Sequence, residues 1–221
     1  VDLFVSPSRF LGEKIAQYGY GEKVLRIQPY TLDLDAYPPC FDDSDYYVFM
    51  GRLTHEKGLH FLLDAVKMIE GAKLKILGTG PLEAELRLRI SREGLRQVEM
   101  LGYKAGDELK EIVRRAKFTV VTSEWHDNSP LVIYESLALG NPVIGARMGG
   151  IPELIDEGVD GFTFARGDLK TFVDRVNHLI ERPELCAQMG RNGRLKAERL
   201  FGFDAHYPQL LRLYEETRRL A

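Results

Sequence analysis

The sequence predicts an α/β protein: a Rossmann-like, doubly wound parallel sheet with helices on both faces and a C-terminal helical extension. Three observations predict this class. From Tyr46 onward, short runs of apolar and β-branched residues alternate with segments whose apolar residues recur at helical spacing. Such alternation is typical of a parallel sheet with right-handed crossovers. The 221 residues, 44% of them hydrophobic, are enough to enclose one good core, and the residues after 168 keep only helical spacing.

The first part of the chain reads as a smaller unit. Residues 3–5 form an apolar run that predicts a strand, and the Ser-Pro-Ser sequence at 6–8 ends it and begins a helix over 9–18. A second short strand is predicted at 24–27. The segment 29–39 has proline at both ends, and we interpret it as a linker.

The regular part of the chain begins after this linker. We expect strands at 46–50, 74–77, 98–101, 118–122, 142–145 and 162–164. We expect helices at 58–69, 83–92, 108–115 and 130–139, and a single helical turn at 152–155. Beyond the last strand we expect four helices, at 169–180, 183–189, 194–201 and 203–220, because Pro and Gly separate these runs.

Composition excludes several classes of partner. The net charge of −3 and the absence of a Lys/Arg tract argue against nucleic acid. No apolar run approaches the roughly 20 residues needed to span a bilayer, so we expect no transmembrane segment. Cys40 and Cys186 lie far apart without CxxC spacing, which fits a reduced, cytoplasmic compartment and offers no metal cluster.

The segment 122–135 is predicted to be a strand-to-helix loop, where α/β proteins usually carry their chemistry. Asn128 or Ser129 can act as the N-cap of the following helix, and Pro130 suits its first turn. The free N–H groups that follow predict an anion site. Asp127 and Glu135 are about two helical turns apart, so one carboxylate lies at the mouth of the loop and the other along the helix.

A second polar loop, Gly51 to Gly58, carries Arg52 and Lys57 between a strand and a helix. Two cations at the carboxyl edge of the sheet can neutralise a pyrophosphate, although on this segment alone a solvated polar loop is an equally good interpretation. The spacing is not that of a Walker loop. Because these cations would supply the charge that Mg²⁺ normally brings, a metal site at Asp127 is disfavoured.

Two glycine turns and one histidine are weaker signals. Gly78 and Gly80 begin like a dinucleotide fingerprint without its third glycine, and we interpret them as a tight turn that lets the base of a ligand approach, with a plain turn as the simpler reading. The turn at 149–150 offers free N–H groups or is only structural. His126 follows Trp125, and packing is a better interpretation than catalysis.

Four motifs in this order resemble a known family: Gly-Arg-x4-Lys-Gly from Gly51, Asp-x7-Glu from Asp127, Gly-x-Pro-Val from Gly140 and Gly-Gly-x-Pro-Glu from Gly149. Together they make nearly the whole chain similar to the C-terminal, donor-binding half of a retaining GT-B glycosyltransferase of family four, the glycogen-synthase and mannosyltransferase-like group. The resemblance implies transfer of a sugar from a nucleotide-diphosphate sugar with retention of configuration and without metal or other cofactor.

The resemblance also implies roles for individual residues. Arg52 and Lys57 would meet the diphosphate, Glu135 the ribose hydroxyls and Asp127 the transferred sugar, and these four are the candidate catalytic residues. The candidate donor-binding residues are Gly51, Gly78, Gly80, Gly102, Tyr103, Asn128, Ser129, Pro130, Leu131 and Val132. The chain departs from the family at Asp127, where Glu is usual, and at 29–33, which reads Pro-Tyr-Thr-Leu-Asp in place of Pro-Asn-Gly-Val-Asp.

The same resemblance implies a division into parts. We expect residues 1–27 to belong to or adjoin an N-terminal domain that precedes Val1, residues 28–200 to form the nucleotide-sugar-binding domain, and residues 201–221 to form a helix that packs back on the first domain. The first and last parts should therefore expose an apolar strip. An acceptor sugar, glycan or lipid would bind mainly to the preceding domain, which leaves peripheral membrane contact open. The alternatives are a nucleotide-sugar epimerase of the same architecture and a nucleotide-binding module without turnover.

Overall fold

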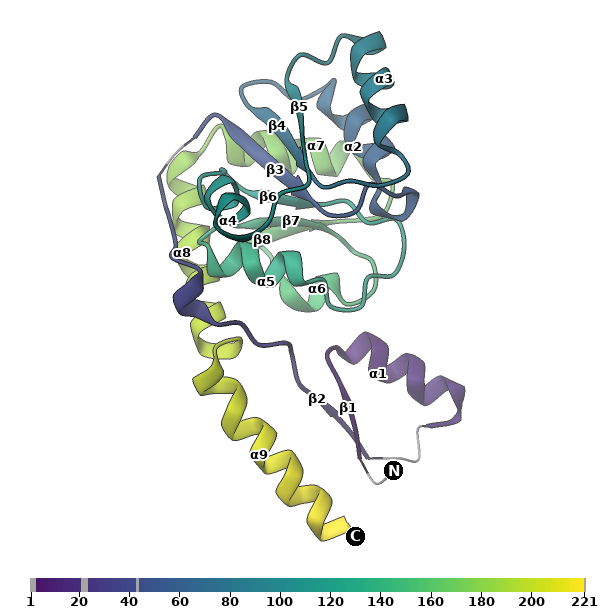
Figure 1. Ribbon diagram of the computed structural model, residues 1–221, viewed down its shortest axis with the longest axis vertical. Coiled ribbons are helices and arrows are strands. Elements are labelled where there is room, and N and C mark those ends of the chain that lie inside the picture. The colour runs from purple at the N-terminus through teal and green to yellow at the C-terminus, as the bar shows by residue number, and fades with distance from the viewer. Residues whose placement is uncertain (1–2, 21–23, 43, 221) are drawn as a thin grey trace.

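The computed structural model describes residues 3–20, 24–42 and 44–220, and its largest unit is a six-stranded parallel sheet (Figure 1). The strand order is β5-β4-β3-β6-β7-β8. The strands are β3 (Tyr46–Met50), β4 (Lys73–Leu77), β5 (Val98–Gly102), β6 (Thr119–Val121), β7 (Val143–Ala146) and β8 (Gly161–Phe164). Every residue of β3, β6, β7 and β8 is buried, as expected for parallel strands covered on both faces.

Helices cover both faces of this sheet, so the predicted fold class is confirmed. One face carries α2 (Leu59–Val66), α3 (Glu83–Glu93) and α7 (Leu169–Ile180). The other carries α4 (Gly106–Arg114), α5 (Leu131–Ala138) and α6 (Ile151–Leu154). The long helix α8 (Pro183–Leu200) contacts both α5 and α7 and so joins the two layers.

The chain changes direction across the sheet at β3. It moves outward from β3 to β4 and β5, and then returns to the other side of β3 as β6, where Val48 is in register with Thr119. The loops that leave β3 and β6 therefore run to opposite faces. In open α/β sheets a crevice forms at the carboxyl ends of two such strands, and ligands bind there.

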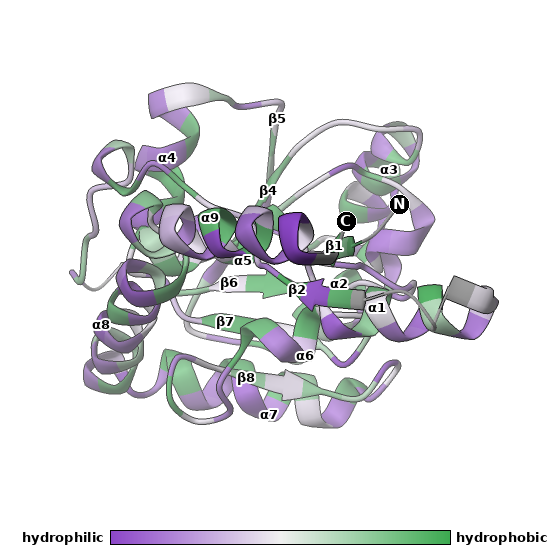
Figure 2. Cartoon of the chain, turned by 90° about the horizontal axis from the view of Figure 1, so that it is seen from below, coloured by the Kyte–Doolittle hydropathy of each residue, from purple (hydrophilic) through white to green (hydrophobic). Residues whose placement is uncertain are grey.

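The first residues form a second, two-stranded parallel sheet, apart from the large one (Figure 1). Its strands are β1 (Leu3–Ser6) and β2 (Val24–Ile27), and α1 (Arg9–Ile15) follows β1 and continues into a kinked segment, Ala16–Tyr20, in which Gly19 has φ 91°. The C-terminal helix α9 (Phe203–Leu220) extends toward this small sheet (Figure 2). Arg26 of β2 forms an ion pair with Glu216 of α9. The linker predicted at 29–39 contains one 3₁₀ turn, η2 (Leu34–Ala36).

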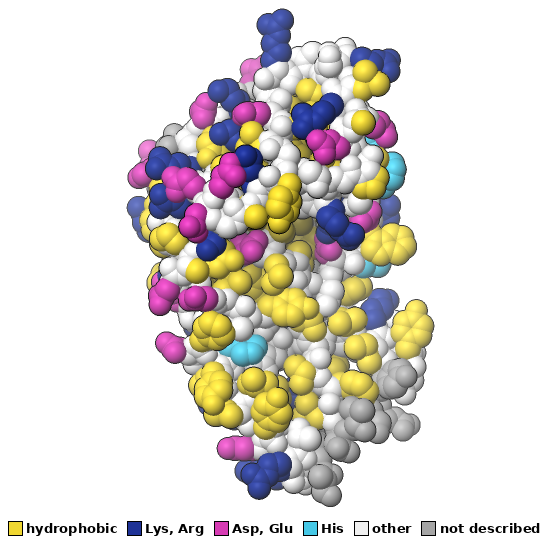
Figure 3. Space-filling model, viewed as in Figure 1, with side chains coloured by type: hydrophobic (Ala, Val, Ile, Leu, Met, Phe, Trp, Pro, Cys, Tyr) yellow, Lys and Arg dark blue, Asp and Glu magenta, His cyan; other side chains and the backbone are white. Residues whose placement is uncertain are grey.

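Apolar side chains gather on the surface of this part, as the sequence predicts. Figure 3 shows them over the lower half of the molecule, where α9 and the small sheet lie. The exposed residues here include Val5, Ile27, Tyr30, Phe203, Tyr207, Leu211 and Tyr214. Apolar patches of this kind usually mark an interaction surface.

The prediction of two separate helices at 183–189 and 194–201 is wrong, because α8 is continuous from Pro183 to Leu200. Its glycines do not break it; they let it lie close to α5. A Cβ at Gly190 would come within 2.1 Å of the Gly140 carbonyl oxygen, and a Cβ at Gly193 within 2.7 Å of Leu137 Cδ2. Tertiary contact has overridden the low helix propensity of glycine.

We expect Gly190→Ala to lower the free energy of unfolding by about 1 to 3 kcal/mol, because the added methyl meets a backbone carbonyl that cannot rotate away. Gly193→Ala is the matched control. There the obstacle is a flexible leucine side chain, and the gain in helix propensity of about 1 kcal/mol offsets its movement. Urea unfolding of the two variants and the wild type checks this order. A Gly190→Ala variant as stable as Gly193→Ala contradicts it.

Candidate functional site

The loops after β3 and β6 are joined to one another by hydrogen bonds to backbone carbonyls. The Thr122 hydroxyl donates a 2.8 Å hydrogen bond to the Lys57 carbonyl, and the Glu124 N–H donates one of 2.8 Å to the Glu56 carbonyl. Gly58 has φ +70°, and a Cβ there would lie 2.0 Å from the Thr122 carbonyl oxygen. Only glycine fits this position, so the two polar loops predicted from the sequence form one wall at the carboxyl edge of the sheet.

Lys57 and Asp127 form an ion pair across this wall, which the sequence did not indicate. The Lys57 Nζ lies 3.0 Å from Asp127 Oδ1 and 2.8 Å from Oδ2. The Ser123 hydroxyl donates a further 2.5 Å hydrogen bond to Oδ2. Because both side chains are about a quarter exposed, at 21% and 25%, the pair is partly screened and can be exchanged for a ligand. The two groups assigned by resemblance to phosphate and sugar thus neutralise each other in the structure.

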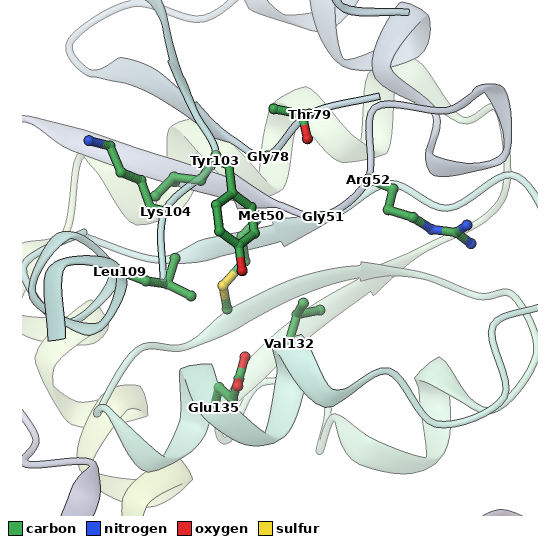
Figure 4. A pocket seen from close by; sticks show the side chains of 11 residues that line it. Met50, Gly51, Arg52, Gly78, Thr79, Tyr103, Lys104, Leu109, Val132 and Glu135 are labelled. Carbon is green, nitrogen blue, oxygen red and sulfur yellow. The ribbon is translucent and has the colours of Figure 1, made fainter. Parts of the chain in front are cut away.

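Arg52 is held far less firmly. Its side chain is 77% exposed, and Glu56 lies 3.8 Å from its guanidinium nitrogen. Figure 4 shows it at the rim of a cavity of about 290 Å³ at the carboxyl ends of the strands. A guanidinium in such a position can turn toward an anion at little cost.

The cavity has an apolar body and a few polar groups. Met50, Leu77, Leu109 and Val132 supply apolar walls, and Thr79, Tyr103 and Glu135 supply polar atoms. Tyr103 is 73% exposed and stands over the cavity, with Glu135 on the opposite side (Figure 4). Such a lining suits a flat ring that is fixed by a small number of hydrogen bonds.

Glu135 lies in the second turn of α5 and is half buried. The Tyr37 hydroxyl donates a 3.2 Å hydrogen bond to its Oε1. Burial raises the pKa of the Glu135 carboxyl, while the Tyr37 hydrogen bond and the charge of Lys110 act in the opposite direction. Burial, with the charge of Glu135, raises the pKa of Tyr37 to about 12, so that hydroxyl stays protonated and remains a donor. Tyr37 is a site residue that the sequence analysis missed, since 98 positions separate it from its partner.

The N-terminus of α5 lacks the side-chain cap that we predicted. The helix begins at Leu131 after Pro130, and neither Asn128 nor Ser129 caps it. Both side chains have other partners: Asn128 Oδ1 accepts a hydrogen bond from the Ser8 hydroxyl, and the Ser129 hydroxyl lies 2.7 Å from that of Tyr134. Within the described residues the first N–H groups of α5 therefore have no side-chain acceptor, which favours an anion there.

The glycine turn after β4 has a different cause from the one we expected. A Cβ at Gly78 would lie 1.9 Å from the Gly51 carbonyl oxygen, and one at Gly80 would lie 2.5 Å from that of Leu53. The close approach is between two loops of the chain, so the interpretation that small residues admit the base of a ligand is not needed. Gly78 still lines the cavity, and its N–H donates a 2.8 Å hydrogen bond to the carbonyl of Gly102, the residue before Tyr103.

The loop that carries Asp127 also contacts the first part of the chain. Phe10 packs on His126, with ring centroids 5.0 Å apart, which agrees with the packing role preferred for this histidine. The Glu153 carboxylate accepts hydrogen bonds of 2.8 and 2.7 Å from the N–H groups of Arg9 and Phe10 at the start of α1. The Gly150 N–H donates a 2.7 Å bond to the Asp127 carbonyl. The predicted Gly-Gly-x-Pro-Glu turn thus supports this loop and joins it to α1.

In the described ranges no three His, Cys, Asp or Glu side chains are grouped so that they could hold a metal ion. No helix in the same ranges is long and apolar enough to cross a membrane.

A family model described as "Glycosyl transferases group 1" matches residues 37–196, which contain the six-stranded sheet and the whole cavity. The chain therefore belongs to the glycosyl transferases of group 1, and the resemblance found in the sequence is confirmed.

Among curated relatives, the D-rhamnosyltransferase WbpZ of Pseudomonas aeruginosa is 30% identical over 210 residues, covering 89% of this chain and 54% of that protein. A glycosyltransferase of Methanocaldococcus jannaschii is 28% identical over 174 residues, covering 79% and 49%. The sulfoquinovosyl transferase of Arabidopsis thaliana is 27% identical over 215 residues, covering 90% and 41%. The chain thus spans about half the length of these relatives.

Solved structures share the fold. HepE of Anabaena, solved in complex with UDP, has a TM-score of 0.86 and 22% identity, covering 98% of this chain and 64% of that one. The sucrose-phosphate synthase of Thermosynechococcus elongatus has a TM-score of 0.87 and 21% identity, covering 100% and 59%. At these identities the likeness concerns the fold alone.

The raised pKa of Glu135 predicts a pH-dependent effect of Glu135→Gln on stability. A carboxyl whose pKa is raised by folding stabilises the protein fully below its unfolded pKa, and this contribution is lost as the pH rises through the folded pKa. Above the folded pKa the wild type carries a half-buried negative charge on Glu135, which the glutamine variant lacks. Without ligand, the melting temperature of Glu135→Gln should exceed that of the wild type at about pH 8, and the difference should shrink toward about pH 4.

Glu99→Gln, an exposed carboxylate on β5, controls for the loss of one negative charge. A difference in melting temperature that grows as the pH falls would show that the carboxylate of Glu135 is stabilised by its surroundings, contrary to this account.

Proposed function

We propose that this chain is the donor-binding half of a retaining glycosyltransferase, which transfers a sugar from a nucleoside-diphosphate sugar without a metal ion. The observation that carries the proposal is the cavity at the carboxyl ends of β3, β4 and β5. It places a half-buried carboxylate, Glu135, across from an exposed ring, Tyr103, and has Arg52 at its rim.

Each part of a nucleotide has a matching surface. The apolar body of the cavity suits a base, and the Glu135 carboxylate can accept hydrogen bonds from the ribose hydroxyls. The uncapped N-terminus of α5 and the Arg52 guanidinium suit the diphosphate, because N–H groups at a helix start and a forked cation both bind phosphate oxygens. Val132, in the first turn of α5, lies between these two regions as part of the cavity wall.

The chemistry to be assisted is heterolysis of the bond between the anomeric carbon and the diphosphate oxygen. Negative charge grows on the departing nucleoside diphosphate, and fixed cations and N–H groups lower the barrier where that charge develops. In this proposal Lys57 leaves Asp127 for the diphosphate, and Asp127 is then free to orient the hydroxyls of the sugar. Retention of configuration is proposed from the motif resemblance.

The comparisons with known proteins support the use of a nucleotide-sugar donor in general, not of one particular donor. HepE was solved with UDP and with UDP-glucose, and two of the curated relatives are named as rhamnosyl and sulfoquinovosyl transferases. Family membership favours transfer over an epimerase or a module without turnover. We propose further that the acceptor binds to a second domain, which packs against the exposed apolar side chains of α9 and of the β1–β2 sheet.

The first test is binding of UDP, GDP and ADP without metal. Because the countercharge comes from Arg52, Lys57 and the start of α5, one of these nucleotides at about 100 times its dissociation constant should add roughly 2.7 kcal/mol to the free energy of unfolding. Thermal unfolding in EDTA and in Mg²⁺ measures this. A shift that appears only with Mg²⁺ is evidence against the metal-free reading.

The Lys57–Asp127 ion pair predicts that neutralising Asp127 and neutralising Glu135 change nucleotide affinity in opposite directions. Asp127→Asn releases Lys57 from its partner, so it should tighten binding of the bare nucleoside diphosphate about two- to fivefold, the equivalent of one partly exposed ion pair. Glu135→Gln should weaken the same binding. Isothermal titration calorimetry of both variants and the wild type, with the nucleotide that stabilises the wild type, measures the dissociation constants that check this. Weaker binding by Asp127→Asn means that Lys57 does not exchange partners.

A further inference from the structure

Tyr37 reaches the nucleotide site from outside it. It lies in the segment 28–42, between the small sheet and β3, and its hydroxyl donates to Glu135 Oε1 at 3.2 Å. We propose that Tyr37 is a positioning residue that holds the Glu135 carboxylate in the orientation in which it meets the ribose hydroxyls of the nucleotide. This inference rests on the proposed function, because it gives Glu135 the ribose as its ligand.

Three contacts hold Tyr37 in place, and the one with Arg194 joins it to α5. Arg194 of α8 donates from Nη1 to the Tyr37 carbonyl at 2.6 Å and to the Ala138 carbonyl, at the end of α5, at 2.8 Å. One guanidinium nitrogen thus joins the backbone of Tyr37 to the helix that carries Glu135. The Tyr37 N–H donates to the Leu34 carbonyl at 3.1 Å, and Lys110 Nζ lies 4.7 Å from the centre of the tyrosine ring. The backbone and ring of Tyr37 are therefore held in place, and so is the position of its hydroxyl beside Glu135.

The position of Tyr37 leaves room for a ligand. It lines a smaller cavity of about 80 Å³, which shares Met50, Leu109 and Glu135 with the larger one. Tyr103 and Arg52 line only the larger cavity. Glu135 therefore stands between the two spaces and accepts from Tyr37 through Oε1, while Figure 4 shows its carboxylate directed into the larger cavity. A ribose there can be met by a carboxylate that is already oriented.

Holding the carboxylate matters because a glutamate side chain has several rotamers. Ordering such a side chain at the moment of binding costs affinity, and a contact that orders it beforehand removes that cost. The charged and titratable groups that line the two cavities around Glu135 are Tyr37, Lys110, Lys104, Tyr103 and Arg52. Among the described residues, Tyr37 is the one whose side chain is hydrogen-bonded to this carboxylate.

The test compares a ribonucleotide with its 2′,3′-dideoxy analogue, using whichever of UDP, GDP or ADP stabilises the wild type most. The wild type should prefer the ribonucleotide, and Glu135→Gln should lose that preference. Tyr37→Phe should weaken ribonucleotide binding about five- to tenfold, the usual effect of one hydrogen bond, and should leave binding of the dideoxy analogue nearly unchanged. Tyr30→Phe, in the same segment but packed on Tyr134, is the matched control and should keep the full preference.

A second readout is the pH dependence of ribonucleotide binding. Removing the Tyr37 hydroxyl takes away a hydrogen bond that lowers the pKa of the Glu135 carboxyl. Binding that needs the ionised carboxylate should then be lost at a higher pH in Tyr37→Phe than in the wild type.

The outcomes of the nucleotide comparison distinguish the role of Glu135 in ribose binding from the positioning role of Tyr37. If Glu135→Gln keeps the preference for ribose, the role of Glu135 in the proposed function is wrong, and the role of Tyr37 fails with it. If Glu135→Gln loses the preference but Tyr37→Phe keeps it, only the positioning role is overturned. An equal loss of both nucleotides in Tyr37→Phe shows a merely structural tyrosine and also overturns the inference.

Discussion

The backbone contact between the loops after β3 and β6 is the constraint on which the site depends. The Thr122 carbonyl occupies the space where any residue but glycine at position 58 would put its side chain, and the hydrogen bonds of 2.8 Å beside it hold the loops in register. These loops come from strands on either side of the point where the chain reverses direction in the sheet. A cation and an acid on different loops therefore share one wall: the backbone fixes where the two side chains begin, and only the side chains remain free to exchange partners.

The charged groups of the site, Lys57 and Asp127 on this wall and Glu135 on α5, are held in two ways. Lys57 and Asp127 neutralise each other where water still reaches them, so their pair is weak and exchangeable. Glu135 is half buried, and this burial raises the pKa of its carboxyl. Stability alone would favour a neutral residue there. Such a site gives up folding free energy for ligand contacts, as functional sites commonly do.

The sequence could predict what is local. The buried strands are short apolar runs, and the four motifs fix the two polar loops and their order along one sheet edge. Its failures have tertiary causes. Glycine at 190 breaks isolated helices, but here it admits the Gly140 carbonyl; Asn128 is a good helix cap, but Ser8 engages its side chain. The hydrogen bond from Tyr37 to Glu135 joins a linker to a helix 98 positions later, and no periodicity encodes such a contact.

The segment 28–42 connects the β1–β2 sheet to the large sheet. It carries Tyr37, whose hydroxyl reaches Glu135 at the proposed ribose site. A rotation of the first part large enough to pull Tyr37 away from Arg194 would change how firmly Glu135 is held, so nucleotide affinity would then depend on the angle between the two parts. Linkage requires the reverse as well: a nucleotide that prefers the ordered carboxylate biases the angle by the same free energy. The linker would thus carry a signal in both directions.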